Sequence, residues 1–266
     1  MFMNIQGAVI VVTGGGAGIG RATVLELLRR GANVAAVDLN DEGLQQTAAL
    51  AEAGDRLSLH QLNITNREAV AALPDEVAAQ HGKADGLINV AGIIQPFVNI
   101  VDLEFDQIER VMSVNFWGTL NMVKAFLPAL MKRPTASLVN VSSMGALLPV
   151  PGQSAYGASK AAVRLLTEGL YAELQGTNVA VTEVFPGAIS TEISKNSGVE
   201  RAAASVDPAS AKTTTPEEAA RQIAEAVEKK TFRLHIGSDA KLFDKLSRII
   251  PQRAIGMIAK RMKDLV

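Results

Sequence analysis

The sequence predicts an α/β fold, with one domain over residues 1–266 built on a doubly wound, parallel, seven-stranded sheet with helices on both faces. Three observations predict it. Short, continuously apolar runs alternate with longer segments of helical periodicity, the pattern of buried parallel strands joined by crossover helices. The first of these runs leads into a glycine-rich turn. The 266 residues are 48% hydrophobic and 20% charged, which suits one globular domain of this length.

The strands are the elements whose ends the sequence marks most clearly. We expect them at residues 8–13, 33–39, 57–62, 85–90, 137–142, 178–185 and 232–237. Helices are expected between the first six, where apolar residues recur at intervals of three and four. The polar stretch 194–215 is long for an ordinary connection and is interpreted as a lid over the substrate, and residues 239–266 form a C-terminal extension.

Composition and charge exclude several classes of function. A net charge of -1 gives no field that would attract nucleic acid, and the absence of cysteine excludes disulfides and thiolate metal sites. The three histidines, His60, His81 and His235, lack ligand spacing, so no metal site is expected. The N-terminus has no basic region, cleavage site or long apolar run. We therefore expect a cytoplasmic protein without a membrane span.

The stretch "TGGGAGIG" (13–20) follows the first strand and precedes a helical segment. Glycines at such a turn let the backbone bend sharply and approach a pyrophosphate, which then faces the amide groups of the helix N-terminus. The spacing is Gly14-x-x-x-Gly18-x-Gly20 and not G-x-G-x-x-G. Glycines alone would also suit a plain structural turn, but their position after the first strand predicts a Rossmann-type dinucleotide site.

Asp38 ends the second strand, 18 residues after Gly20. A carboxylate there can accept both ribose hydroxyls of an adenosine and would repel a 2′-phosphate. Neither Leu39 nor Asn40 supplies a cation that would neutralise such a phosphate, although Arg21, directly after the glycine turn, is close in sequence. The pattern favours NAD over NADP, with a helix or turn cap as the alternative role for Asp38.

"SAYGASKAAV" (154–163) places Lys160 four residues after Tyr156, on the same face of a helix. A phenol with a pKa of about 10 is a weak base at neutral pH, and a neighbouring cation lowers that pKa. The lysine together with a positive nicotinamide ring would bring it to near 7, a differential stabilisation of roughly 4 kcal/mol. By itself the pair also fits a solvated surface.

Several further motifs occur in one order with these: "NVAG" (89–92), "SVNFWG" (113–118), "VNVSSMG" (139–145) and "FPGAIST" (185–191). With them the chain resembles the short-chain dehydrogenase/reductase family in its compact, non-extended form, over nearly its whole length. The resemblance implies that Tyr156 is the general acid/base, that Ser143 hydrogen-bonds the reacting oxygen, and that Asn115 holds water in a proton relay running to Lys160. Ser143 is preferred to Ser142 because the family pattern places this serine thirteen residues before the tyrosine.

The resemblance also implies contacts with the nucleotide. It assigns an adenosine ribose turn, a bend beneath the nicotinamide and carboxamide contacts to the later motifs. The implied cofactor-binding residues are Gly14, Gly16, Gly18, Ile19, Gly20, Asp38, Leu39, Asn63, Ile64, Asn89, Ala91, Gly92, Tyr156, Lys160, Pro186, Gly187, Ile189 and Thr191. The chain departs from the family at Asn63, where an acid is common, and at Val90, where a second Asn is common. The Asn63 side-chain oxygen can still accept from an adenine amino group.

These features predict an NAD-dependent oxidoreductase of secondary alcohols or ketones. Apolar side chains near the catalytic end of the sheet either line a hydrophobic substrate pocket or pack against neighbouring protein, namely Phe97, Met144, Leu147, Leu148 and Val150. Alternatives are an NADPH-dependent 3-oxoacyl thioester reductase and a non-catalytic dinucleotide sensor. A homo-oligomer, a tetramer by the resemblance, is expected from apolar residues on both sides of "AAVRLLTEGLYAEL" (161–174).

The C-terminal stretch 241–266 has seven basic and two acidic residues, with apolar residues at helical spacing interrupted by Pro251. Such a segment covers the pocket, joins subunits or lies on a membrane surface. The expected ligand is a small molecule and not a nucleic acid.

Overall fold

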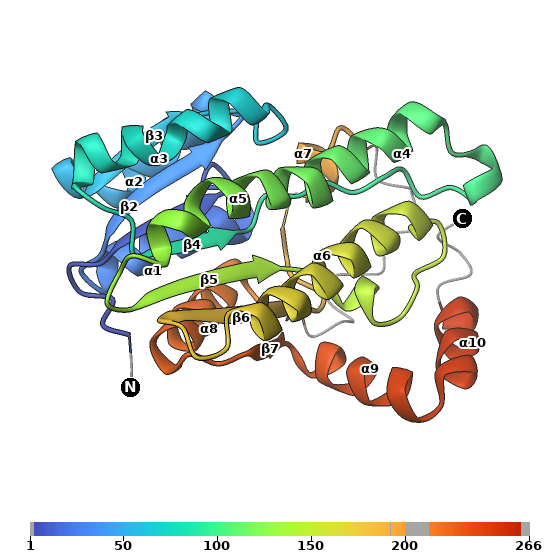
Figure 1. The fold of residues 1–266 in the computed structure, drawn as a ribbon. Helices are drawn as coiled ribbons and strands as arrows, with labels where there is room; N and C mark the ends of the chain where they lie inside the picture. Colours follow the sequence, from blue (N-terminus) through green and yellow to red (C-terminus); the bar gives the residue numbers. More distant parts are fainter. Residues whose placement is uncertain (1–2, 192, 200–212, 262–266) are drawn as a thin grey trace.

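The computed structural model describes residues 3–191, 193–199 and 213–261 and is built around one parallel sheet (Figure 1). The strand order is β3-β2-β1-β4-β5-β6-β7, with every neighbouring pair parallel. The strands are β1 (Val9–Thr13), β2 (Asn33–Asp38), β3 (Leu57–Gln61), β4 (Gly86–Asn89), β5 (Ala136–Val141), β6 (Val179–Pro186) and β7 (Arg233–Ile236). All seven predicted strands are confirmed, and each end lies within one residue of its prediction.

Helices connect the strands, as the periodicity predicts. They are α1 (Gly18–Arg29), α2 (Asp41–Ala51), α3 (Arg67–His81), α4 (Phe105–Met112), α5 (Thr119–Leu130), α6 (Ser154–Glu173), α7 (Ile193–Asn196), α8 (Pro216–Lys229), α9 (Ser238–Ile249) and α10 (Pro251–Arg261). Between α4 and α5 the chain forms a π-helical turn, η3 (Ser113–Gly118), and a short 3₁₀ turn, η4 (Met144–Ala146), follows β5. Of the proposed lid at 194–215, residues 200–212 lie outside the described residues.

Alternating strand residues build a core on each face of the sheet. Ile10 and Val12 of β1 lie in one core with α1 and α8, whereas Val9 and Val11 lie in the other with α3, α5 and α6. All four are fully buried. Because helices cover both faces, the doubly wound architecture is confirmed (Figure 1).

β1 and β4 are neighbours in the sheet, and the chain leaves them in opposite directions, toward β2 and toward β5. In an open α/β sheet such a reversal leaves a crevice at the carboxyl ends of the strands, where ligands bind. The glycine turn and "NVAG" both follow these strands and meet at this crevice. No described helix is both long and apolar enough to cross a membrane.

Candidate active and dinucleotide site

The glycine turn is closed so tightly that two of its positions cannot carry a side chain. Gly14 has a φ of 72°, and a Cβ on it would lie 3.0 Å from the Ala91 amide nitrogen. A Cβ on Gly20 would lie 1.9 Å from the Gly14 carbonyl oxygen. The Thr13 hydroxyl accepts from the amides of Val90 and Ala91, both at 3.1 Å, and so ties "NVAG" to the glycine turn. The only sequence signal for this role of Thr13 is its place at the end of the first strand.

Asp38 lies at the carboxyl end of β2 and faces the glycine turn. Its Oδ2 accepts from the Gly16 amide at 2.9 Å and its Oδ1 from the Asn40 amide at 3.0 Å. The carboxylate is half-buried, whereas Leu39 is 65% exposed. Each carboxylate oxygen has two lone pairs, so both can accept a further hydrogen bond.

Arg21 directly follows Gly20 in the sequence and is held between the glycine turn and α2. Its guanidinium donates to the Gly16 carbonyl, to the Thr47 hydroxyl at 3.1 Å and to the Gly43 carbonyl at 3.3 Å. The Thr47 hydroxyl in turn donates to the Gly15 carbonyl at 2.8 Å. Arg21 therefore buttresses the turn from the side of α2.

The side chains of two predicted nucleotide contacts already have partners within the protein. The Asn63 side-chain oxygen accepts from the amide and hydroxyl of Thr65, at 3.0 and 2.9 Å, which uses both of its lone pairs. An adenine amino group could therefore bond this oxygen only by displacing one of the Thr65 groups. Asn89 is buried and donates to Asn140 Oδ1 at 2.9 Å, which leaves its backbone for any contact with a ribose. Ile64 is also buried and packs against Gly118.

The bend predicted beneath the nicotinamide is fixed by a residue of the C-terminal extension. Pro186 ends β6, and a Cβ on Gly187 would lie 2.2 Å from Asp239 Oδ1. Asp239 Oδ2 accepts from the Ala188 amide at 2.8 Å. This role of Asp239 has no distinctive sequence signal, because a single acid in the first turn of a helix is common and is stabilised by the helix dipole.

The two predicted carboxamide contacts follow this bend. Thr191 lies over the glycine turn, with its Cγ2 3.5 Å from a Cβ placed on Gly18, and Ile189 pairs with Thr214 through a β-bridge. The bend beneath the nicotinamide and the start of α1, where Ile19 and Gly20 lie, therefore share one crevice.

Ser143 and Tyr156 lie against the same backbone segment. A Cβ on Gly145 would be 3.4 Å from the Ser143 hydroxyl and 3.6 Å from a Tyr156 ring carbon, so both side chains border this glycine, and Ser143 acts to lower the pKa of the phenol. Ser142 is turned away, because its buried hydroxyl donates to the Lys160 carbonyl at 2.8 Å. Of the two serines, only Ser143 lies with the tyrosine.

Lys160 and Asn115 meet on the other side of the loop after β4. A Cβ on Gly92 would be 3.0 Å from Lys160 Nζ and 3.2 Å from Asn115 Oδ1. Lys160 is buried and donates to the Val141 carbonyl at 3.1 Å. The Asn115 amide group bonds both backbone groups of Ile93, at 2.8 and 2.9 Å, and so holds this loop. Asn115 lies in the π-helical turn, a departure from α-helix that recurs at functional sites.

Burial shifts the pKa values of both Tyr156 and Lys160. Burial raises the pKa of Tyr156 above its ordinary value, and the hydrogen bond to Ser143 only partly opposes this. Burial also lowers the pKa of Lys160 to about 8. The fall of the phenol pKa toward 7 was predicted for the site with a positive nicotinamide ring bound and stays a prediction. Without the dinucleotide, burying the phenolate costs more than its protein partners return.

Gln95 sets the start of the helix that carries Tyr156. This residue is 1% exposed, and its Oε1 accepts from the Tyr156 amide at 2.9 Å. Gln95 Nε2 donates to the Gly152 carbonyl, and Gln153 Nε2 donates back to the Gln95 carbonyl, both within 2.9 Å. No sequence signal marked Gln95, since its role depends on a contact 61 residues away in the chain.

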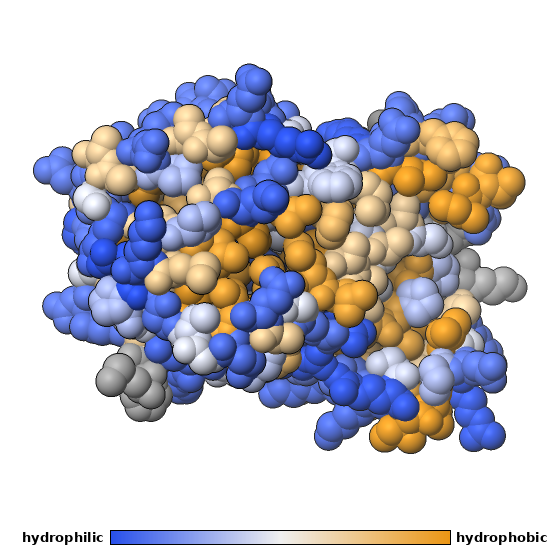
Figure 2. Space-filling model, in the orientation of Figure 1, coloured by the Kyte–Doolittle hydropathy of each residue, from blue (hydrophilic) through white to orange (hydrophobic). Residues whose placement is uncertain are grey.

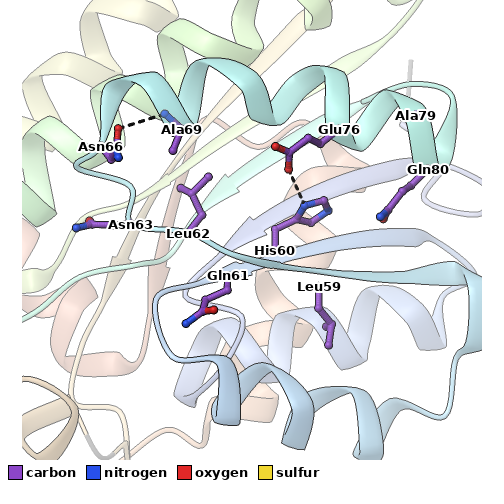
Figure 3. A pocket seen from close by; sticks show the side chains of 10 residues that line it. All are labelled: Leu59, His60, Gln61, Leu62, Asn63, Asn66, Ala69, Glu76, Ala79 and Gln80. Carbon is purple, nitrogen blue, oxygen red and sulfur yellow. Dashed lines mark hydrogen bonds and ion pairs between the residues drawn. The ribbon is translucent and has the colours of Figure 1, made fainter.

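A separate groove of about 730 Å³ lies along the edge strand β3 and α3. Figure 3 shows His60 and Glu76 pointing toward one another in it, 3.5 Å apart. His60 is buried, burial lowers its pKa, and it also bonds the Ser58 hydroxyl at 2.9 Å, so its role is structural. Of the predicted site residues this groove contains only Asn63. Within the described residues, no three His, Asp or Glu side chains could share a metal ion.

Comparison with known proteins agrees with this geometry. Residues 8–202 match the family described as short chain dehydrogenase. The chain belongs to this family. It is 39% identical over 255 residues to SadH of Mycobacterium tuberculosis, whose name places it among the oxidoreductases, covering 93% of this chain and 92% of the relative. It is 34% identical over 194 residues to the 3-oxoacyl-[acyl-carrier-protein] reductase FabG of Thermotoga maritima, covering 73% and 78%.

A solved structure of a family member shares the fold throughout. It is a short chain dehydrogenase of Burkholderia cenocepacia in complex with NADP, with a TM-score of 0.81 and 31% identity, covering 96% of this chain and 99% of that one. The protein is accordingly an oxidoreductase of the short-chain dehydrogenase type. The family uses a nicotinamide dinucleotide, and the closed glycine turn, the Asp38 carboxylate and the Gly187 bend suit such a molecule.

Proposed function

We propose that this short-chain dehydrogenase transfers a hydride between NAD and a secondary alcohol or ketone. One observation carries the proposal: Ser143 and Tyr156 both border Gly145 at the carboxyl end of the sheet, with Lys160 one helical turn from Tyr156. Oxidation of an alcohol needs a base for the hydroxyl proton at the point where the hydride leaves the carbon. A bound nicotinamide supplies the hydride acceptor, and the protein supplies the base.

Tyr156 takes the hydroxyl proton in oxidation and returns it in ketone reduction. Ser143 hydrogen-bonds the substrate oxygen and holds it near the phenol. Lys160 lies one helical turn after the tyrosine and would stabilise the phenolate that forms. The Asn115 amide group is occupied by Ile93 and Ser159, so a relay water would be held by its main-chain oxygen, which also accepts from Thr119. The proton would pass through this water to solvent.

We further propose that NAD is preferred to NADP. Asp38 would repel a 2′-phosphate. The guanidinium of Arg21, directly after the glycine turn, donates its hydrogen bonds to that turn and to α2. The NADP complex of the Burkholderia cenocepacia relative shows that the fold itself can also accept NADP. Titration of the protein with both dinucleotides tests the preference, and equal or tighter binding of NADP would refute it.

The proposed substrate is apolar and small. Met144, Leu147 and Val150, which follow Ser143 in sequence, and Phe97 in the loop after β4 are half-exposed and suit an apolar ligand. Leu148 is instead buried at 4% exposure against α10, so it belongs to the packing of the C-terminal extension.

A homo-oligomer, of tetrameric form, is proposed from the outer surface of the helices. Trp117, Leu165 and Tyr171 are 44%, 70% and 38% exposed on η3 and α6. Figure 2 shows apolar side chains gathered over α5 and α6. A surface of this kind is usually covered by another subunit.

FabG of Thermotoga maritima supports a second candidate, the reduction of 3-oxoacyl thioesters. The Asp38 carboxylate argues against the NADPH that such a reaction usually takes. A panel of secondary alcohols, ketones and a 3-oxoacyl thioester, assayed with both cofactors in both directions, separates the candidates. Turnover of alcohols with NAD supports the proposal. Turnover restricted to the thioester would favour the second candidate, and none across the panel would favour a dinucleotide sensor.

A further inference from the structure

The outer face of α9 and α10 combines apolar and basic side chains and has no exposed acid. Here this face is called the C-terminal surface and consists of the exposed residues between positions 238 and 260. Its large apolar members are Leu242, Ile249, Ile255 and Met257, which are 43 to 77% exposed. Its charged members are Lys241, Lys245, Arg248, Arg253 and Lys260. On α9 the basic residues recur at intervals of four and three, which places them along one side of the helix.

Both acids of this segment are turned toward the protein. Asp239 accepts from the Ala188 amide at 2.8 Å, and Asp244 pairs with Arg248 at 3.0 Å and with His235 at 3.4 Å. The Asp244 side chain is only 15% exposed. The whole chain has a net charge of -1, so the positive charge of the C-terminal surface is local.

The opposite side of the two helices is packed and holds them in place. Ala254 and Ile258 of α10 are buried against Leu148, with Phe243 and Leu246 of α9 beside them. Leu148 lies five residues after Ser143, so the two helices border the substrate end of the site. In Figure 1 they form a corner on the side toward which the carboxyl ends of the strands point.

We propose that the C-terminal surface binds the surface of an anionic lipid bilayer. Helices that lie in a membrane interface insert apolar side chains to the boundary of headgroups and acyl chains and direct lysine and arginine to the phosphates. Leu242, Ile249 and Met257 supply the inserted side chains, whereas Ile255 lies on another side of α10. The attraction comes from Lys241, Lys245, Arg253 and Lys260, since Arg248 is paired with Asp244. The proposal is independent of the reaction that the site performs.

A second copy of the chain fits this face less well. A symmetric contact through the C-terminal surface would bring its unpaired cations, Lys241, Lys245, Arg253 and Lys260, together with those of the second copy, which is repulsive. The protein has another exposed apolar cluster, at Val101 and Phe105 at the start of α4, which are 85% and 80% exposed. That cluster is flanked by exposed Asp102, Glu104 and Asp106, so it would be repelled by an anionic bilayer. Charge therefore distinguishes the C-terminal surface as the face that meets lipid.

Membrane binding in this orientation would bring the substrate end of the site close to the lipid. An apolar alcohol or ketone partitions into a bilayer and would reach the site from there. The absence of a membrane-spanning helix among the described residues is compatible with binding of this reversible kind.

Co-sedimentation of the full chain with large vesicles tests the proposal. We expect binding to vesicles of phosphatidylcholine with about 30% phosphatidylglycerol, little binding to phosphatidylcholine alone, and a steep loss between about 0.05 and 0.5 M salt. Replacing Lys245→Gln together with Arg253→Gln should weaken binding by roughly 30-fold, at about fivefold for each charge. Ile249→Ser and Met257→Ser should each weaken it by about tenfold.

The double variant Lys124→Gln with Lys132→Gln is the matched control, because both lysines are exposed on and after α5, away from the C-terminal surface. It should bind as the parent does. Equal loss in the control and in the Lys245/Arg253 variant would overturn the proposal, as would absence of binding or salt-independent binding to neutral vesicles. Light scattering of each variant completes the test. A change of oligomeric state in the Ile249 or Met257 variant would assign the surface to a second copy and overturn the proposal.

Discussion

Lys160 is expected to cost the folded protein stability at neutral pH, and replacing it should show this. Burial lowers its pKa from 10.5 to about 8, so the folded state disfavours the charged form. The penalty is fully present below about pH 8, where the lysine is charged in both states, and is relieved as the pH rises toward the unfolded pKa. Between pH 7 and pH 9.5 the relief amounts to about 2 kcal/mol.

Lys160→Met removes the titrating group and keeps most of the side-chain volume. The difference in unfolding free energy between the parent and this variant should therefore shift by about 2 kcal/mol in favour of the parent between these two pH values. Urea unfolding without dinucleotide, at one fixed protein concentration, measures it. Lys124→Met, on the exposed face of α5, controls for the loss of a charge and should show no such shift. A constant difference for Lys160→Met would refute the buried, destabilised lysine.

Three further changes test the dinucleotide site. Gly20→Ala places a Cβ 1.9 Å from the Gly14 carbonyl and should abolish NAD binding in a fluorescence titration, whereas retained affinity would show that the turn can open. Asp239→Ala removes the acceptor for the Ala188 amide and should weaken NAD binding by about tenfold, the value of one hydrogen bond to a charged group, and unchanged affinity would remove Asp239 from the site. Asp38→Ser with Leu39→Arg should shift the preference toward NADP by at least about tenfold, and no shift would make Asp38 a cap.

The fold could be predicted from the sequence because each strand is a continuously apolar run with polar or glycine boundaries. Val9 to Thr13 is fully buried, so its composition carries a strong signal. The turn at Gly14 was predictable for the same reason, since its geometry tolerates glycine alone. Such features are local in sequence, and local physics decides them.

Features that depend on distant contacts could not be predicted. Gln95 and Asp239 act through bonds to Tyr156 and Ala188, far along the chain, and neither has a distinctive neighbourhood in sequence. The rise in the pKa of Tyr156 without dinucleotide could not be predicted either, because the sequence shows the partner at Lys160 but not the desolvation of both groups. For Leu148 the sequence left a pocket and packing against protein as alternatives, and its contact with α10, which decides for packing, appears only in the fold.

The acid/base role of Tyr156 is the central claim, and Tyr156→Phe tests it most directly. The substitution keeps the ring beside Gly145 and removes only the phenol hydroxyl. In one preparation, the NAD affinity should stay within about threefold of the parent, while alcohol oxidation under saturating cofactor should fall by roughly 10²-fold or more, the scale of acid/base catalysis. Oxidation at near the parental rate by a variant that still binds NAD would contradict the mechanism.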